Sequence, residues 1–218
     1  MVKQYGFYVN ADECLGCRMC IIACKDKNNL PVGEKFRRVY DYSGGSWEVD
    51  ANGVMSPSGL FSYGVSAGCH HCASPACVPV CPVGAMQKRE DGIVWTDSEI
   101  CIGCGSCVAA CPFEAPYVST EANVAQKCDM CKDLIDNGEN PVCVQSCQVR
   151  CLEYGELDDL KAAHPEATGL IDPLPKNAGT EPSSIYTPHR MNPNDALSGE
   201  VRNAPEEIIS ETIGITLK

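Results

Sequence analysis

The sequence is poor in aromatic residues and has no long apolar run. Only 6% of its 218 residues are aromatic, with 4 Phe and 2 Trp. Apolar packing alone would hold such a chain poorly, so other links must organise many of its residues. The longest uncharged stretch that leans apolar, residues 59–68, is well short of the roughly 20 residues that a membrane-spanning helix needs. We therefore expect no transmembrane segment.

The sequence is also short of positive charge. It has 17 Lys and Arg against 29 Asp and Glu, which gives a net charge of −12 and a pI near 4.7. This balance argues against binding DNA or RNA through phosphates. Residues 1–14 have no apolar core after their single lysine, so we expect no secretory or twin-arginine signal in this sequence. Any export would then depend on a partner's signal.

Cysteine, by contrast, is abundant and regularly spaced. Sixteen of the 17 cysteines fall in four groups of four, and each group opens with C-x2-C and closes with C-x3-C. The gap between these two pairs is two residues in the first and third groups, four in the second and eleven in the fourth. The groups are, in chain order, Cys14, Cys17, Cys20 and Cys24; Cys69, Cys72, Cys77 and Cys81; Cys101, Cys104, Cys107 and Cys111; and Cys128, Cys131, Cys143 and Cys147.

Three kinds of chemistry use so many thiols. A disulfide framework predicts a small secreted chain and gives no reason for repeated C-x2-C pairs. Structural zinc combines two C-x2-C half-sites across a longer loop and gains nothing from a third cysteine two residues further on. The run C-x2-C-x2-C-x3-C-P is typical of bacterial ferredoxins, in which three thiolates hold one iron-sulfur cubane and the fourth ligates its neighbour. We therefore interpret the cysteines as iron-sulfur ligands.

The spacing also has a mechanical meaning. Cysteines two residues apart can wrap a loop around one face of a cluster, with backbone N–H groups directed at its sulfurs. Gly16, Gly103 and Gly105 would allow the backbone to approach closely. The third and fourth cysteines are four residues apart, so helices over residues 20–24 and 107–111 would put each pair on one face, about one turn apart. Each helix would then bridge two clusters.

An internal repeat indicates a duplicated ferredoxin fold. Residues 13–25 and 100–112 share their cysteine spacing, a glycine and an Ala-Cys pair. Glu90-Asp91-Gly92, between two strand-like segments, is a hairpin signal. Residues 69–112 therefore resemble one bacterial two-cluster ferredoxin.

A second unit would be assembled from segments on either side of the first. Strands predicted at residues 4–10 and 149–157 would accompany the first and fourth cysteine groups, so that one unit is inserted in the other. The predicted fold class is α+β: two bacterial-ferredoxin-like two-cluster units, a loop-rich insertion and an extended C-terminal tail. The predicted boundaries are 1–30 and 120–160 for the outer unit, 31–66 for the insertion, 67–119 for the inner unit and 161–218 for the tail.

Residues 1–175 as a whole resemble the iron-sulfur electron-transfer B subunit of the dimethyl sulfoxide reductase family of molybdoenzymes. The segments that carry this resemblance include QYGFYVNADECLGCRMCIIACKD, CHHCASPACVPVCPVGAM, CIGCGSCVAACPFEAP and KCDMCKDLIDNGENPVCVQSC. The resemblance implies two [4Fe-4S] clusters in each ferredoxin-like unit, four in all. The implied ligand sets are Cys14, Cys17, Cys20 with Cys147; Cys128, Cys131, Cys143 with Cys24; Cys69, Cys72, Cys77 with Cys111; and Cys101, Cys104, Cys107 with Cys81. Some nitrate reductase relatives carry Trp in place of Cys104 and hold a three-iron cluster, so this chain's Cys implies a full cubane.

The resemblance implies electron transfer without catalysis. No Ser-His-Asp set, carboxylate pair or phosphate-binding loop is recognisable, and every strong motif is a cluster ligand. The implied role is to relay electrons between a membrane subunit that oxidises quinol and a molybdopterin catalytic subunit that reduces an S-oxide or N-oxide acceptor. The chain would reach the membrane through its partners, after assembly in the cytoplasm and with export on a partner's twin-arginine signal left open. The alternatives are an iron-sulfur subunit of a hydrogenase or formate dehydrogenase complex, and a free soluble polyferredoxin.

Three further features carry weaker predictions. Cys151 lies four residues past Cys147 and on a continued helix would face the same cluster, but we favour a buried thiol because the other sixteen already supply all ligands. For His70 and His71 we expect solvent exposure or a hydrogen bond to a cluster sulfur more than ligation. Seven basic residues near the cysteine groups form either a solvated face or a charge that eases cluster reduction. They are Arg18, Lys25, Lys27, Lys88, Arg89, Lys127 and Lys132.

The segments without cysteine groups are predicted from turn signals and composition. Residues 30–68 contain Gly-rich turns, which indicate short strands and loops. Residues 156–163 predict a short helix. Beyond it the chain is rich in Pro, Asn, Ser and Glu without periodicity, so we expect a tail that cannot bury itself alone and that lies across a larger partner.

Overall fold

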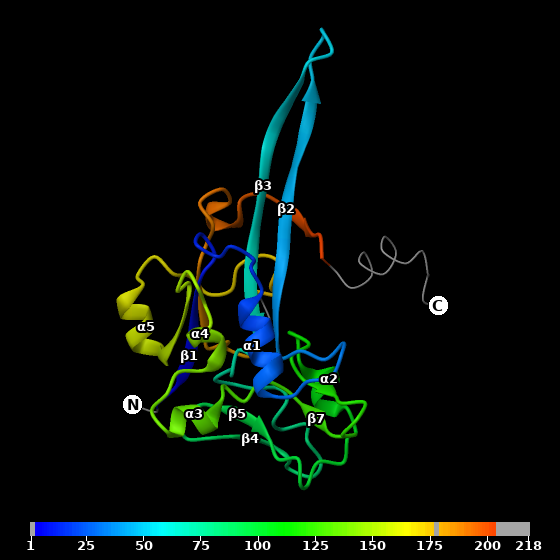
Figure 1. Ribbon diagram of the computed structural model, residues 1–218, viewed down its shortest axis with the longest axis vertical. Coiled ribbons are helices and arrows are strands. Elements are labelled where there is room, and N and C mark those ends of the chain that lie inside the picture. The colour runs from blue at the N-terminus through cyan, green and yellow to red at the C-terminus, as the bar shows by residue number, and fades with distance from the viewer. Residues whose placement is uncertain (1–2, 177–178, 204–218) are drawn as a thin grey trace.

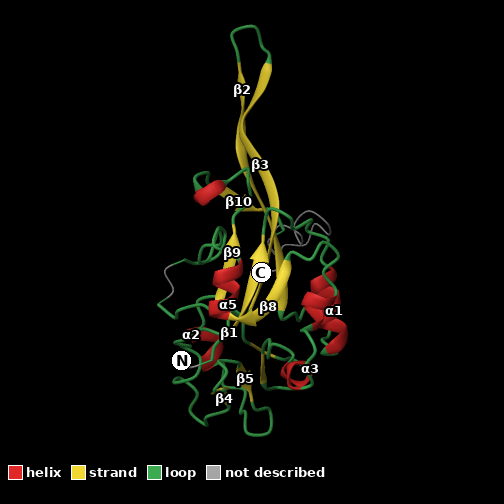
Figure 2. Cartoon of the chain, turned by 90° about the vertical axis from the view of Figure 1, so that its left-hand side faces the viewer, coloured by secondary structure: helices red, strands yellow, loops and turns green. Residues whose placement is uncertain are grey.

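The centre of the molecule is a three-stranded sheet built from segments far apart in the chain. The computed structural model describes residues 3–176 and 179–203. β1 (Tyr5–Asn10) is the middle strand, with β8 (Leu152–Glu156) antiparallel on one side and β9 (Ser184–Thr187) parallel on the other (Figure 2). The strands predicted before the first cysteine group and after the fourth are confirmed, and they pair with each other.

Both faces of β1 are covered, each by a different core. Phe7 and Val9 pack in the main core, while Tyr8 between them packs with Leu160 of helix α5 (Leu157–Ala163). Successive side chains of a strand point to opposite faces, so this continuous apolar run serves two cores at once. α5 confirms the short helix predicted from the sequence.

Four short helices accompany the cysteine groups. The two predicted helices are present as α1 (Met19–Lys27) and α2 (Ser106–Ala110). α3 (Lys132–Asp136) and α4 (Val142–Gln145) lie between the cysteines of the fourth group, and α4 packs against α1. Within the part of the chain that the structure describes, no helix is both long and apolar enough to cross a membrane.

Two small hairpins form the lower part of the molecule in Figure 1. β4 (Met86–Lys88) pairs antiparallel with β5 (Val94–Thr96), which confirms the predicted hairpin. Gly92 in its turn has a φ of 85°, in the left-handed region that favours glycine. β6 (Tyr117–Val118) pairs in the same way with β7 (Ala125–Gln126), beside α2.

The segment expected to be loop-rich is in fact one long hairpin. β2 (Arg37–Val49) and β3 (Met55–Gly68) pair antiparallel, and their outer part projects far beyond the rest of the molecule (Figures 1 and 2). The expectation of short strands was wrong because Gly44 and Gly45, which indicated a turn, lie within a strand where the pairing register shifts. A Cβ at Gly45 would lie 2.5 Å from the carbonyl oxygen of Gly59, so the irregularity needs glycine.

The C-terminal segment is not a free tail. β9 completes the central sheet, η1 (Pro193–Asp195) is a short 3-10 helix, and β10 (Gly199–Val201) pairs antiparallel with β2. Ile171 and Tyr186 are buried in the main core. The expected tail over residues 161–218 was therefore wrong as far as residue 203, and the rest of it lies outside the described residues.

The tail lacks periodicity because its strands are very short. β9 pairs with β1, and β10 pairs with β2. Each therefore forms its backbone hydrogen bonds along the edge of a strand from another part of the chain. A pattern within the segment therefore could not reveal that it is ordered.

Candidate metal centres

The cysteines do not form disulfides or a site for a single metal ion. All 17 have free thiols. Among residues 3–176 and 179–203, no three His, Cys, Asp or Glu side chains are grouped as one ion would require. Structural zinc needs its ligands within about 2.3 Å of one ion, whereas a cubane distributes four thiolates over its separate irons. The arrangement therefore does not fit structural zinc.

Four cysteines from two groups line one cavity beneath the base of the long hairpin. Cys69, Cys72 and Cys77 belong to the loop that follows β3, and Cys111 comes directly after α2. The first three are buried. Lys127 also lines this cavity.

A second cavity lies beside the small hairpin β4–β5. It is lined by Cys101, Cys104 and Cys107 together with Cys81. The backbone N–H of Ala125 donates to Cys101 Sγ at 3.3 Å. Cys104 is exposed, so this cavity lies near the surface.

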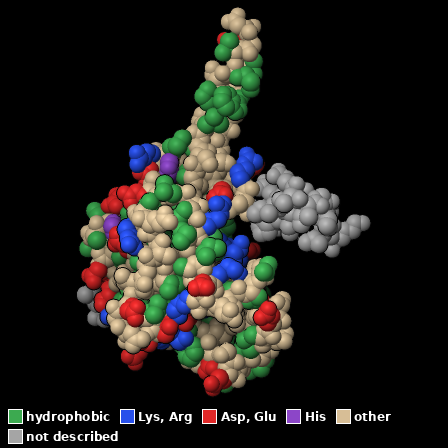
Figure 3. Space-filling model, viewed as in Figure 1, with side chains coloured by type: hydrophobic (Ala, Val, Ile, Leu, Met, Phe, Trp, Pro, Cys, Tyr) green, Lys and Arg blue, Asp and Glu red, His purple; other side chains and the backbone are tan. Residues whose placement is uncertain are grey.

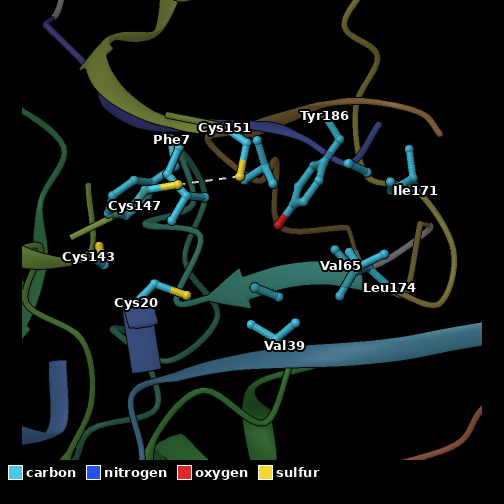
Figure 4. Close-up of a cluster of buried hydrophobic side chains, with 14 of the residues drawn as sticks. Phe7, Cys20, Val39, Val65, Cys143, Cys147, Cys151, Ile171, Leu174 and Tyr186 are labelled. Atoms are coloured by element: carbon cyan, nitrogen blue, oxygen red, sulfur yellow. Dashed lines mark hydrogen bonds between the residues drawn. The ribbon is translucent and has the colours of Figure 1, made fainter. Parts of the chain in front are cut away.

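The remaining eight cysteines of the four groups lie around the packed helices α1 and α4. Cys20, Cys143 and Cys147 are buried in the main core (Figure 4). Burial raises the pKa of Cys24 to about 12, and the charges of Cys143 and Cys131 add to the rise. These charge effects indicate that the thiols of Cys24, Cys131 and Cys143 lie near one another.

The loops around these thiols have the expected backbone conformation. Gly16, Gly103 and Gly105 all have positive φ, between 63° and 76°. Met130 also has a left-handed backbone, and its N–H donates to Cys128 Sγ at 3.4 Å. Backbone N–H groups thus point at sulfur, as a loop around an anionic cluster requires.

Comparison with known proteins shows what kind of domain contains these cysteines. A family model described as a 4Fe-4S dicluster domain matches residues 60–157, and one described as a 4Fe-4S binding domain matches residues 11–33. The "Probable anaerobic dimethyl sulfoxide reductase chain YnfG" of Escherichia coli (strain K12) is 42% identical over 209 residues, 95% of this chain and 100% of the relative. The B subunit of anaerobic dimethyl sulfoxide reductase from the same organism is 41% identical with the same coverage. The chain is a member of the iron-sulfur electron-transfer subunits of the dimethyl sulfoxide reductase family.

A further relative shows how broad this B-subunit family is. The "Thiosulfate reductase electron transfer subunit PhsB" of Salmonella typhi is 37% identical over 162 residues, which cover 73% of this chain and 79% of the relative. The electron-transfer role implied by the family resemblance is confirmed by this membership. The chain is an electron-transfer subunit of an oxidoreductase complex.

The residues around the cavities fit the [4Fe-4S] clusters of this B-subunit family. Burial raises the pKa of Cys77 to about 12 and that of Cys72 to about 11. Cluster ligands must be thiolates, so bound iron has to displace these protons. His70 Nδ1 and Thr180 Oγ1 are buried without a partner among the described residues, and both residues line the first cavity. A cluster bound there would supply anionic sulfur next to these unpaired atoms.

The two histidines are buried, so the first of the two expectations, solvent exposure, was wrong, and a hydrogen bond to a cluster sulfur stays a prediction. His70 and His71 are 2% and 0% exposed, and burial lowers the pKa of His70 to about 3. His71 Nδ1 accepts a hydrogen bond from the backbone N–H of Val94 at 3.0 Å, so in the neutral ring the proton is on Nε2. That N–H has no partner among the described residues.

Cys151 is buried and also faces a predicted ligand. It is 3% exposed, and its Sγ lies 3.5 Å from Cys147 Sγ (Figure 4). A hydrogen bond with Cys151 lowers the pKa of Cys14, and the same contact raises that of Cys151. Cys151 is thus a buried thiol next to a predicted ligand.

Most of the seven basic residues are neutralised by neighbours. Four form ion pairs with carboxylates: Arg18 with Asp41, Lys27 with Asp133, Arg89 with Asp91 and Asp136, and Lys132 with Asp129. Lys25 and Lys88 donate to backbone carbonyls. Only Lys127 comes close to a cysteine sulfur, with its Nζ 3.6 Å from Cys69 Sγ. The contact of Lys127 with a predicted ligand favours the electrostatic interpretation for this residue, and for the other six both interpretations stay predictions.

Sequence reasoning missed two residues near the thiols. Arg37 is buried at the start of β2, and its Nη1 donates to Ser66 Oγ at 3.2 Å. Ser66 Oγ lies 3.5 Å from Cys20 Sγ. Nothing in the sequence distinguishes Arg37 from the exposed basic residues, because its burial depends on the pairing of β2 with β3.

Proposed function

We propose that the chain holds four [4Fe-4S] clusters and relays electrons between a molybdopterin catalytic subunit and a membrane subunit that oxidises quinol. The observation that carries the cluster count is the make-up of the two cavities. One combines Cys69, Cys72 and Cys77 with Cys111, and the other combines three cysteines of the third group with Cys81. In two-cluster ferredoxins, each cluster takes three ligands from one cysteine group and the fourth from the other group.

The other two clusters would be held by the cysteines around α1 and α4. Cys20 and Cys147 both lie in the main core and Cys14 packs against it, which supports a set of Cys14, Cys17, Cys20 and Cys147. The mutual charge effects among Cys24, Cys131 and Cys143 support the last set, which Cys128 completes.

The nested arrangement of two ferredoxin-like units is part of the proposal. Residues 1–30 and 120–160 would form the outer unit, and 67–119 the inner one. The pairing of β1 with β8 supports it, since these strands flank the first and fourth cysteine groups. The residues between the units, 31–66, would include most of the long hairpin.

Charge effects connect three of the four proposed ligand sets. The charge of Cys143 acts on Cys20, and the charge of Cys69 acts on Cys128. The clusters, when bound, would supply one-electron redox chemistry. Among the proposed ligands, Cys17 and Cys104 are exposed.

Exposed apolar residues support fixed partners over a free polyferredoxin. Trp47, Val49, Val54 and Met55 on the projecting hairpin are all more than half exposed, and hydrophobic side chains gather on its outer part (Figure 3). Exposed apolar patches of this kind mark protein contacts. We therefore propose that the hairpin contacts a partner subunit.

The names of the relatives favour a reductase complex over a hydrogenase or formate dehydrogenase. Those relatives belong to dimethyl sulfoxide and thiosulfate reductases. We propose an S-oxide, N-oxide or related acceptor, bound by the catalytic subunit. The complex would be membrane-associated through its anchor subunit, after cluster insertion in the cytoplasm.

Metal analysis of the purified complex tests the cluster count. We expect about sixteen iron atoms and as many sulfides in this chain. Cys111→Ser should perturb one cluster and leave three unchanged, as seen by electron paramagnetic resonance of the reduced protein. Cys151→Ser is the matched control and should leave four. Eight iron atoms in the wild-type chain would contradict the proposal.

A further inference from the structure

Two basic side chains are buried without a carboxylate partner. Arg37 is 3% exposed and Lys127 is 5% exposed, and neither forms an ion pair within the described part of the chain. An isolated buried charge is very costly, and proteins normally pair it. Each of these cations therefore requires a negative charge that no carboxylate supplies.

The contacts of Arg37 lead to a cysteine sulfur. The guanidinium lies over the Phe7 ring, 4.8 Å from its centroid, and donates to Ser66 Oγ on the adjacent strand. A guanidinium has no acceptor, so Ser66 Oγ must be the acceptor of this bond. The Ser66 hydroxyl hydrogen is then free to donate to Cys20 Sγ, 3.5 Å away. A Cys20 thiolate bound to a cluster has no hydrogen to donate, so the hydrogen bonds would then run from Arg37 to Ser66 and from Ser66 to Cys20.

The contacts of Lys127 lead to another cysteine sulfur. Its ammonium donates to the carbonyl oxygens of Val94 and Cys128, the latter at 2.7 Å. Its third contact is Cys69 Sγ at 3.6 Å. An ammonium offers three hydrogens and no acceptor, so two are used by carbonyls and one remains for sulfur.

The charges around Arg37 come from thiols. Burial by itself would lower the pKa of Arg37, but the charges of Cys143, Cys20 and Cys128 outweigh burial, and the net pKa is raised. The guanidinium thus lies among predicted cluster ligands, and its hydrogen-bonded route through Ser66 leads to Cys20.

We propose that Arg37, acting through Ser66, and Lys127 are positioning residues that raise the reduction potentials of the clusters bound by Cys20 and Cys69. This inference rests on the proposed function. One-electron reduction adds a negative charge to a cluster, and a fixed cation or a hydrogen bond to its sulfur stabilises the reduced form. Both cations are buried, so solvent and salt screen their attraction to the reduced cluster only weakly.

Redox titration of the purified complex, followed by electron paramagnetic resonance, tests this inference. In Ser66→Ala and in Arg37→Gln we expect the same one of the four midpoint potentials to fall. In Lys127→Gln a different one should fall. We expect the ratio of oxidised to reduced cluster at a fixed applied potential to rise about tenfold, which is about 59 mV for a one-electron couple. Lys127→Arg keeps the charge and should restore most of the potential.

Matched controls separate these effects from general changes in charge. Arg38→Gln changes the neighbour of Arg37, which pairs with Glu114, and Lys161→Gln changes an exposed lysine of α5 that pairs with Asp158. Both should leave all four potentials unchanged.

The outcomes also distinguish this inference from the proposed function. Four clusters with unchanged potentials in Ser66→Ala overturn the Arg37 relay, and the same result in Lys127→Gln overturns the role of Lys127. Loss of one cluster from Lys127→Gln but not from Lys127→Arg would support a counter-charge, whereas loss from both would overturn it. A wild-type chain with fewer than four clusters would instead contradict the proposed function.

Discussion

At the residue scale, the surroundings of a cysteine decide what it does. Cys104 is exposed and lines a cavity with three other thiols. Cys151 is buried, and its Sγ lies 3.5 Å from that of Cys147. Both side chains are thiols with other thiols nearby. Cys104 shares its cavity with three of them, which together make up the four ligands of a cubane.

Cys104→Ser should stop electron transfer through the chain. A cubane that loses one thiolate can lose that iron and remain as a three-iron cluster, and cluster type and charge set potential over hundreds of millivolts. An electron that reaches the altered centre would stay there and would not pass to the next cluster. We expect quinol-driven turnover of the assembled enzyme to be lost, while an artificial dye that reduces the catalytic subunit directly still supports activity.

Cys151→Ser is the control for this experiment, because it should spare both activities and all clusters. The measurements are the quinol and dye assays and electron paramagnetic resonance, each made on both variants. Quinol activity in Cys104→Ser with four intact cubanes, or cluster loss in Cys151→Ser, would contradict the ligand assignment.

At the scale of elements, the C-terminal segment supports the loop that carries the second cysteine group. The carbonyl oxygens of Glu181 and Thr180 accept hydrogen bonds from the backbone of Ala73 and Ser74, at 2.8 and 3.1 Å. The N–H of Ser183 donates to the carbonyl of His70 at 3.0 Å. The strand that follows, β9, is paired with β1, so the loop and the central sheet are joined through this segment.

The amides of β9 should therefore be protected from hydrogen exchange in the isolated, cluster-loaded subunit as strongly as in the complex. The reason is that their partners are strand β1 and the buried core of the same chain. The hairpin turn at residues 50–54 is the internal reference, since it is exposed and should exchange fast in the isolated subunit. Protection of β9 that arises only on assembly would show that the segment needs a partner.

At the scale of the whole molecule, thiols form a large part of the interior. Among the described residues, one of the three hydrophobic core groups consists of Cys77, Cys107, Met86, Val94 and Ala125. Two of these five residues are predicted iron-sulfur ligands. The main core also includes Cys20, Cys143 and Cys147. Removing iron would leave sulfur-lined cavities and unpaired buried cations in place of close packing.

The cluster-free chain should therefore be largely unfolded. We expect the apo-protein, prepared with a chelator under reducing conditions, to lose the dispersed amide resonances of the loaded protein. Reconstitution with iron and sulfide should restore them. An apo-protein with native-like dispersion would show that the strands and helices hold together without the clusters.

The sequence by itself determined the features that depend on neighbouring residues. The helices after the cysteine pairs, the hairpin around Gly92 and the family itself follow from local spacing, because ligands two to four residues apart restrict the backbone directly. The two ligand sets that line cavities remain predictions, now supported by geometry.

Only the tertiary structure decided the features that depend on remote contacts. The long hairpin replaced the expected loops because Gly45 opposes Gly59 across two strands. The C-terminal segment is ordered because β1 and β2 offer it free edges. Arg37 and Lys127 are buried because strands distant in sequence surround them, and burial changes the energy of a charge more than any local pattern does.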